Sequence, residues 1–232
     1  MIKFEKVTKI YPSTNSGKKE VVALKDISFE VKEKEFVCIV GKSGAGKTTL
    51  LKLILGEEKP TKGKIFFNGE EISKLSPSKL PKIRRKIGAV FQDYKLLPKK
   101  TAAENVAYVM EALGFPDEQI KRDVPQVLEI VNLLEKANYF PHELSAGEKQ
   151  RLAIARSLIH RPKIILADEP TGNLDPYNSA EIIRILLKIN EMGTTVILAT
   201  HNKEIVNSLK KRVISLVEGK IVRDEEKGQF VL

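Results

Sequence analysis

A glycine-rich segment, residues 41–48, constrains the fold of this chain more than any other part of its sequence. The eight residues read Gly-Lys-Ser-Gly-Ala-Gly-Lys-Thr and match the pattern G-x-x-x-x-G-K-[ST] at every position. A continuous apolar run, residues 36–40, precedes the segment, and leucines at helical spacing follow it. We therefore expect a buried strand, a tight glycine-rich loop and an amphipathic helix in direct succession.

The residue types of this loop suit a phosphate group. Glycine has no Cβ, so the backbone can turn its N–H groups inward around phosphate oxygens, and the N-terminus of the next helix attracts the same anion. Lys47 would neutralise the β- and γ-phosphates, and the Thr48 hydroxyl would coordinate Mg²⁺. The sequence predicts a site for a nucleoside triphosphate with Mg²⁺, to which the loop contributes Gly41, Ser43, Gly44, Ala45, Gly46, Lys47, Thr48 and Thr49.

Two adjacent carboxylates, Asp168 and Glu169, follow the apolar run Ile-Ile-Leu-Ala. Open α/β sheets bind ligands at the C-terminal ends of their strands, which is where this pair would lie. Successive strand residues point to opposite sides, so the two side chains should have different tasks. We assign Asp168 to the metal ion and Glu169 to the general base that activates the attacking water. Taken alone, the pair could also simply begin a loop.

Apolar patterning predicts an α/β fold. Residues 27–32 alternate between apolar and polar side chains, as a half-buried strand does, and the last third of the chain alternates between apolar strands and a helix. This succession favours a largely parallel sheet. We expect a single domain, residues 1–232, with an α/β P-loop core and antiparallel β flank in residues 1–99 and 160–232, and an inserted helical subdomain in residues 100–159.

The chain carries 40 Lys and Arg against 30 Asp and Glu, a net charge of +10. Such a surplus suits nucleic acid, nucleotide phosphates or an anionic membrane surface. The chain has no Trp and only 6% aromatic residues, which leaves few stacking platforms for single-stranded nucleic acid. Residues 74–100, here called the basic stretch, contain nine basic residues and one acid, Asp93. This stretch is either a solvated surface or a contact for anionic lipid.

The sequence also predicts a cytoplasmic chain. No apolar run approaches the roughly 18–20 residues that cross a bilayer. The first residues alternate charged and apolar side chains and lack the apolar region of a signal peptide. The single cysteine, Cys38, cannot form an internal disulfide.

Residues 144–151, Leu-Ser-Ala-Gly-Glu-Lys-Gln-Arg, allow two compatible interpretations. Ser145 followed by Glu148 is a capping box ahead of an apolar helical run. A capped helix start with a serine and a glycine, here Gly147, is also an anion site. This segment lies just upstream of the acidic strand end, and it resembles the signature of ABC-type ATPases.

The other motifs of that family appear in order along essentially the whole chain. The resemblance implies that Tyr11 stacks on adenine and that Gln92 is the catalytic and metal-contacting glutamine of the Q-loop. It further implies that Asp175 belongs to the nucleotide-contacting D-loop and that His201 is the catalytic switch histidine. Taken alone, Tyr11, Gln92 and His201 could each be an ordinary surface or structural residue.

The resemblance implies a Mg²⁺-dependent ATPase that works in pairs. Two copies would close head to tail around ATP, with Ser145 and Gly147 of one copy completing the γ-phosphate site of the other. The output would pass to an integral membrane partner, an FtsX-like permease docked in the groove near Gln92 and the helical subdomain. The chain would then lie at the inner face of the cell membrane, with the basic stretch towards anionic lipid.

Two segments, residues 96–106 and 168–175, resemble the cell-division ATPases of bacteria, which implies control of cell-wall hydrolysis. The ATPases of lipoprotein release and of macrolide or peptide export are close alternatives. A DNA-associated ATPase is a more distant one, because only about a hundred residues separate Thr48 from Ser145 and no sustained heptad fills them. We therefore do not expect a nucleic-acid partner.

Three residues depart from the usual pattern of the family. Ala146 replaces the first glycine of the signature, Glu148 stands where many members carry glutamine, and Asn202 follows His201 where aspartate is common. Alanine keeps its N–H, so phosphate binding survives if position 146 needs no positive φ. The capping box explains Glu148, and the sequence offers no explanation for Asn202.

Overall fold

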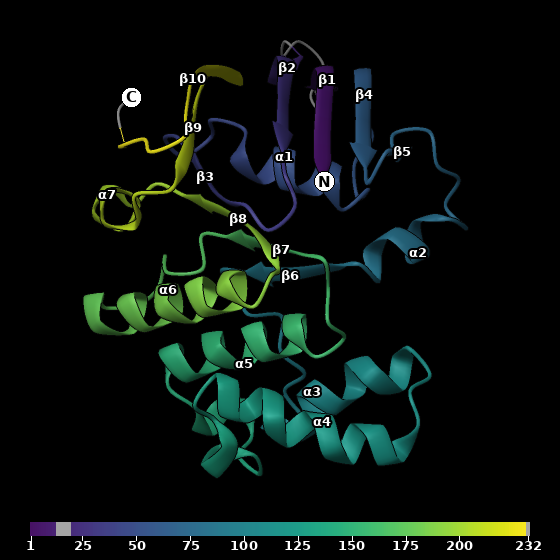
Figure 1. The fold of residues 1–232 in the computed structure, drawn as a ribbon, viewed down its shortest axis with the longest axis vertical. Helices are drawn as coiled ribbons and strands as arrows, with labels where there is room; N and C mark the ends of the chain where they lie inside the picture. The colour runs from purple at the N-terminus through teal and green to yellow at the C-terminus, as the bar shows by residue number, and fades with distance from the viewer. Residues whose placement is uncertain (13–19, 231–232) are drawn as a thin grey trace. The chain divides into compact units, whose positions relative to one another are not determined.

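The computed structural model describes residues 1–12 and 20–230 (Figure 1). The chain divides into two compact units, one formed by Met1–Arg84 with Thr195–Leu232 and the other by Arg85–Thr194. None of the described helices is both long and apolar enough to cross a bilayer.

An antiparallel sheet begins the first unit. Its strands β1 (Ile2–Tyr11), β2 (Val21–Val31), β4 (Lys62–Phe67) and β5 (Glu70–Glu71) lie in the order β2-β1-β4-β5. The buried rings of Phe4 and Phe29 stack across β1 and β2 with their centroids 4.8 Å apart. Such cross-strand aromatic pairs stabilise neighbouring strands. The predicted antiparallel flank is therefore confirmed.

The other strands of this unit are mainly parallel. Strand β3 (Phe36–Val40) lies between β8 (Thr195–Thr200) and β9 (Arg212–Val217) and runs parallel to both, while β10 (Lys220–Glu225) is antiparallel to β9. Every residue of β3 and β8 is buried, which accounts for their continuous apolar sequences. Helix α1 (Lys47–Ile54) follows β3, and α7 (Lys203–Leu209) follows β8.

A short helix, α2 (Leu80–Arg84), supports the end of α1. The guanidinium of Arg84 donates to the carbonyl oxygens of Leu55, at 3.0 Å, and Gly56, at 3.2 Å. The last carbonyl groups of a helix have no intrahelical donor and favour a nearby positive charge. Arg84 is therefore a structural residue within the basic stretch.

The second unit combines a parallel strand pair with a group of helices. Strands β6 (Ile87–Phe91) and β7 (Ile164–Asp168) pair in parallel. Helix α5 packs against β6 and against α3, α4 and α6 (Figure 1). The segment between the two strands is helical and consists of α3 (Ala102–Ala112), α4 (Asp117–Ile130), the short turns η1 (Leu134–Lys136) and η2 (Pro141–Glu143), and α5 (Ala146–Leu158); α6 (Pro176–Glu191) follows β7.

A fully buried amide, Asn105, fixes the entry of the chain into α3. Its Oδ1 accepts the N–H of Leu97 at 2.9 Å, and its Nδ2 donates to the carbonyl oxygens of Leu97, Lys100 and Thr101 at 2.9–3.1 Å. A buried polar group that loses such partners leaves several backbone groups unsatisfied. This one side chain therefore holds the loop that leads from β6 to the helices.

We predict that Asn105→Ala lowers the free energy of unfolding by about 2–4 kcal/mol, because the loop carbonyls and the Leu97 amide lose their partner. Urea denaturation measures the change. Glu111→Ala, at an exposed position of the same helix, is the matched control and should change stability by less than about 0.5 kcal/mol. Equal effects of the two substitutions would contradict the role of Asn105.

Candidate nucleotide-binding site

The loop between β3 and α1 has a shape that only glycine permits at two positions. Gly46 has a φ of +105°, and a Cβ placed on it would lie 2.6 Å from the carbonyl oxygen of Ala23. A Cβ on Gly41 would lie 2.5 Å from the carbonyl oxygen of Leu216. Both distances are too short for any side chain. The tight glycine-rich turn predicted from the sequence is therefore confirmed.

The N-terminus of α1 has free hydrogen-bond donors. Gly46 is the N-cap residue and supplies no side-chain acceptor, and the first turn of the helix contains no acidic residue. Among the described residues, the amides of Gly44, Gly46 and Thr48 donate to no backbone or side-chain acceptor. An uncapped helix start with such amides is an anion site.

Lys47 brings a positive charge to the same loop. Its side chain is only 6% exposed, and its Nζ donates to the carbonyl oxygens of Gly41 at 2.8 Å and Lys42 at 3.3 Å. The ammonium group is therefore held against the loop. The glycine-rich loop, the N-terminus of the helix and the buried ammonium group together suit a chain of phosphate groups.

Strands of the first unit place two further residues that the sequence predicts to contact the nucleotide. His201 comes directly after Thr200, which pairs with Val40, so His201 and Gly41 follow the same edge of two neighbouring parallel strands. This is the edge at which α/β sheets bind ligands. Tyr11 ends β1, and the ammonium group of Lys9 lies 4.8 Å from the centre of its ring.

The acidic pair of the second unit lies where β7 ends. Asp168 is the last residue of the strand, and Glu169 adopts a φ of +46°. Residues other than glycine seldom adopt this left-handed conformation, and here it ends the strand in a bend. The expectation that strand alternation separates the two carboxylates therefore does not apply, since Glu169 lies outside the strand.

Gln92 lies beside the turn that follows Glu169. It comes directly after Phe91, which pairs with Asp168, and its Nε2 donates to Oδ1 of Asn173 at 3.1 Å. A Cβ on Gly172 would lie 2.9 Å from the same Nε2, so the glutamine packs closely against this turn. The structure thus brings the predicted glutamine next to the acidic strand end.

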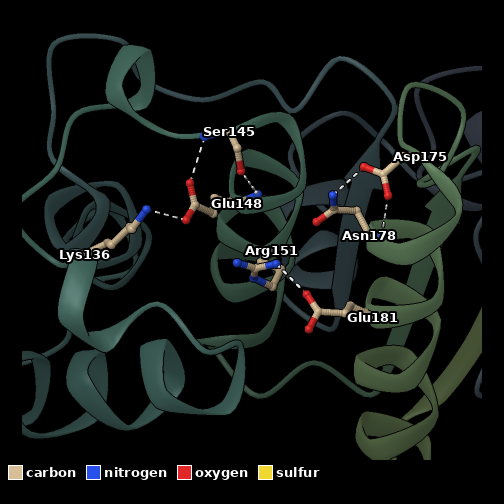
Figure 2. Close-up of polar contacts among 7 residues, drawn as sticks. All are labelled: Lys136, Ser145, Glu148, Arg151, Asp175, Asn178 and Glu181. Atoms are coloured by element: carbon tan, nitrogen blue, oxygen red, sulfur yellow. Dashed lines mark hydrogen bonds and ion pairs between the residues drawn. The ribbon is translucent and has the colours of Figure 1, made fainter.

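The predicted capping box at the start of α5 is confirmed. Ser145 is the N-cap residue: its Oγ accepts the N–H of Glu148 at 3.3 Å, and the Glu148 carboxylate accepts the N–H of Ser145 at 2.8 Å (Figure 2). Lys136 forms an ion pair with the same carboxylate at 2.5 Å. Asp175 has the corresponding position on α6, where it accepts the N–H of Asn178 at 3.0 Å.

The residues assigned to the metal offer oxygen donors of three kinds: the Thr48 hydroxyl, the Gln92 amide and the Asp168 carboxylate. Mg²⁺ prefers oxygen ligands and is usually held by one or two protein groups together with waters and substrate phosphates. The described residues contain no group of three or more His, Cys, Asp or Glu side chains suited to a metal ion. Each of the three groups offers the kind of oxygen donor that Mg²⁺ binds.

Comparison with known sequences decides the family. The sequence model of the ABC transporter family matches residues 24–172. The chain belongs to this family. The cell division ATP-binding protein FtsE of Bacillus subtilis is 51% identical to it over 230 residues, which cover 99% of this chain and 98% of that protein. FtsE of Mycobacterium tuberculosis is 46% identical with the same coverage.

Solved structures of similar proteins support the same family. The dimeric ATP-binding cassette MJ0796, in a post-hydrolysis state bound to ADP and Pi, is 38% identical to this ABC ATPase with a TM-score of 0.88, and the match covers 99% of this chain and 100% of that one. The predicted P-loop α/β fold and the resemblance to the cell-division members are both confirmed. As a member of this family, the chain is an enzyme that hydrolyses ATP.

The structure explains two departures of this ABC ATPase from the family pattern. Ala146 is the first residue of α5 and has no positive φ, so the position accepts alanine in place of glycine. Asn202 is the N-cap residue of α7, where its Oδ1 accepts the N–H of Ile205 at 3.1 Å. Asparagine and aspartate cap helices about equally well, so either residue can follow His201.

Sequence reasoning missed two amides of this ABC ATPase that contact motif residues. Asn173 accepts a hydrogen bond from Gln92, and Asn178 binds Asp175. The signal for Asn178 was present, because an aspartate followed three residues later by a polar residue is a helix start. No sequence signal marks the contact between Asn173 and Gln92, since 81 positions separate them.

The capping box of this ABC ATPase also changes the pKa of the Glu148 carboxyl. Burial opposes the charge of Glu148, but hydrogen bonds from Lys136 and Ser145 outweigh it and lower the pKa of the carboxyl below its usual value of 4.5. A lowered pKa in the folded state means that the charged form stabilises the fold above that value. The contribution is lost as the pH falls below it.

We predict that Glu148→Gln lowers the free energy of unfolding by about 0.5–1 kcal/mol at pH 7, because glutamine keeps the capping geometry but loses the ion pair with Lys136. The difference from the parent chain should shrink as the pH falls below 4.5 and through the lowered pKa of the Glu148 carboxyl, because protonation removes the ion pair. Urea titrations at several pH values measure it. Glu135→Gln, an exposed control on the neighbouring turn, should change the free energy of unfolding at pH 7 by less than about 0.5 kcal/mol.

Proposed function

We propose that the chain is the ATPase subunit of a membrane-associated ABC complex, most similar in role to FtsE, and that it drives an FtsX-like permease in controlling cell-wall hydrolysis. The FtsE relatives match nearly the whole chain and support this assignment. Two copies would close head to tail around ATP and open after hydrolysis, at the inner face of the membrane. A dimeric cassette among the similar structures supports this pairing.

The observation that carries the proposal is the uncapped start of α1 beside the buried Lys47. The loop amides and the ammonium group would bind the phosphates, and the ring of Tyr11 would stack on adenine. Thr48, Gln92 and Asp168 would hold Mg²⁺, which neutralises charge on the phosphates when it is bound. Thr49 completes the loop.

Hydrolysis needs a base that takes a proton from the attacking water, and Glu169 would be that base. Gln92 would orient the water, and His201 would contact the γ-phosphate. Ser145 and Gly147 of the second copy would close the site, with Asp175 of that copy beside them. A single copy would therefore hydrolyse ATP slowly.

Exposed aromatic side chains on the second unit support a docking site for the permease near Gln92 and the helical subdomain. Tyr108, Tyr139 and Phe140 are 37–44% exposed. The ammonium groups of Lys100 and Lys136 lie 5.6 and 5.5 Å from the ring centres of Tyr108 and Tyr139. Exposed aromatic rings beside charged groups are typical of protein interfaces.

The segment between Thr48 and Ser145 argues against a DNA-associated role. Its longest helix, α4, has 14 residues and packs against α3 and α5. A DNA-repair ATPase of this family would need a long coiled coil there. Copurification distinguishes the remaining alternatives: a permease of the FtsX type supports cell division, and an exporter permease supports lipoprotein release or macrolide export.

We predict that Lys47→Ala lowers the affinity for Mg·ATP by about 100-fold or more, because the phosphates lose a charge in a partly desolvated loop. Lys42→Ala, which removes an exposed charge from the same loop, should change the affinity for Mg·ATP by less than about threefold.

We predict that Glu169→Gln binds ATP normally and lowers turnover by about 10²–10⁴-fold, because the attacking water loses its base. Calorimetry and phosphate release measure these effects, and thermal unfolding checks the fold. Normal ATP binding by Lys47→Ala would contradict the proposed site.

The lipid contact of the basic stretch has its own test. We predict that the combined variant Lys82→Glu, Arg85→Glu and Lys86→Glu binds vesicles with anionic lipid at least about tenfold more weakly, because each cation near such a surface contributes about 1 kcal/mol. Arg84 stays unchanged because it caps α1. The control variant replaces the exposed Lys121 and Lys203, which lie outside the basic stretch, with glutamate. Equal vesicle binding by both variants would refute the lipid contact.

A further inference from the structure

Gly147, the glycine of the signature, faces a side chain of another helix. It is buried and has no positive φ. A Cβ placed on it would lie 2.2 Å from Oδ1 and 2.6 Å from Cγ of Asn178 on α6. A side chain at this position would have to displace the Asn178 amide, so the neighbouring amide and not the backbone conformation favours glycine here.

The amide of Asn178 is held in one orientation by Asp175. Its Nδ2 donates to Oδ2 of Asp175 at 2.5 Å, and its backbone N–H donates to Oδ1 at 3.0 Å (Figure 2). Because the nitrogen end of the amide is bound to the carboxylate, the oxygen end turns towards Gly147. One side chain thus connects the D-loop residue Asp175 with the start of α5.

This connection needs both ends of an asparagine. The side chain must donate to a carboxylate and present a small acceptor to a glycine at the same time. Aspartate in its place would put two carboxylates side by side and could not donate. Leucine has a similar size but neither donates nor accepts.

A second contact joins the same helices without touching either helix start. Arg151 on α5 donates to Glu181 on α6 at 2.8 Å, and both side chains are largely buried. Each of these residues lies about one turn beyond Gly147 and Asn178. The ion pair holds the two helices together but leaves the residues of the proposed site untouched, which makes it a matched control.

We propose that Asn178 is a positioning residue that fixes Gly147 relative to Asp175, so that the N-termini of α5 and α6 meet the nucleotide of the partner copy as one body. This inference rests on the proposed ATP-driven pairing. Helix amides act on an anion only at hydrogen-bond distance, and a misplacement of about 1 Å can lower a rate by about 100-fold. Asn178 therefore acts on pairing and turnover and leaves ATP binding by the chain's own loop unchanged.

The test uses the Glu169→Gln chain, in which Mg·ATP should trap the pair. Adding Asn178→Leu or Asn178→Asp should raise the concentration for half-dimerisation at least tenfold in sedimentation experiments. Mg·ATP affinity of the dilute monomer should stay within twofold. Adding Glu181→Gln should lower thermal stability but shift dimerisation by less than threefold.

A double-mutant cycle makes the test specific. Gly147→Ala should weaken ATP-driven pairing because its Cβ meets the Asn178 amide. Asn178→Ala makes room for that methyl group, so Gly147→Ala with Asn178→Ala should pair no worse than Gly147→Ala alone. Additive losses in the cycle would overturn the contact between the two residues.

The outcomes distinguish a failure of the proposed function from a failure of the positioning role of Asn178. If Glu169→Gln itself fails to pair with Mg·ATP, the proposed function fails. If it pairs and Asn178→Leu pairs equally well, the role of Asn178 is refuted while the proposed function stands. Unfolding of the Asn178 variants, or weakened Mg·ATP binding by their monomers, also overturns the positioning role, because it shows a general structural one.

Discussion

The uncapped N-terminus of α1 is the constraint on which the site depends. Gly46 has a backbone conformation and a close neighbour that exclude every side chain, so no capping group can stand there. The buried strand β3 leads into this turn, and Lys47 lies folded over it. The first turn of α1 contains no acidic residue, so its amides and the nearby ammonium group favour an anion, and a phosphate chain supplies one.

Helix starts carry other motif residues as well. Ser145 caps α5, Asp175 caps α6, and Asn202, beside His201, caps α7. A cap stabilises the fold by about 1 kcal/mol and also directs free amides towards a ligand. The start of α5 can therefore serve both as the observed helix cap and as the proposed anion site, and the two interpretations of residues 144–151 are compatible.

The sequence predicted what depends on local chemistry. The glycine-rich turn, the antiparallel flank and the capping box of Ser145 follow from patterns that span a few residues, and the structure contains each of them. It could not predict what depends on packing between distant segments. The contact of Gln92 with Asn173, the Asn178 amide against Gly147 and the capping of α1 by Arg84 join residues 28 to 81 positions apart. The left-handed turn at Glu169 is a further such feature.

Calorimetric titration of the unmodified chain with Mg·ATP, compared with adenosine, tests the central claim most directly. Because the loop recognises phosphate, the account predicts one Mg·ATP bound per chain and binding of adenosine at least about 100-fold weaker. Adenosine that binds as tightly as Mg·ATP, or a titration with Mg·ATP that shows no binding, would contradict it.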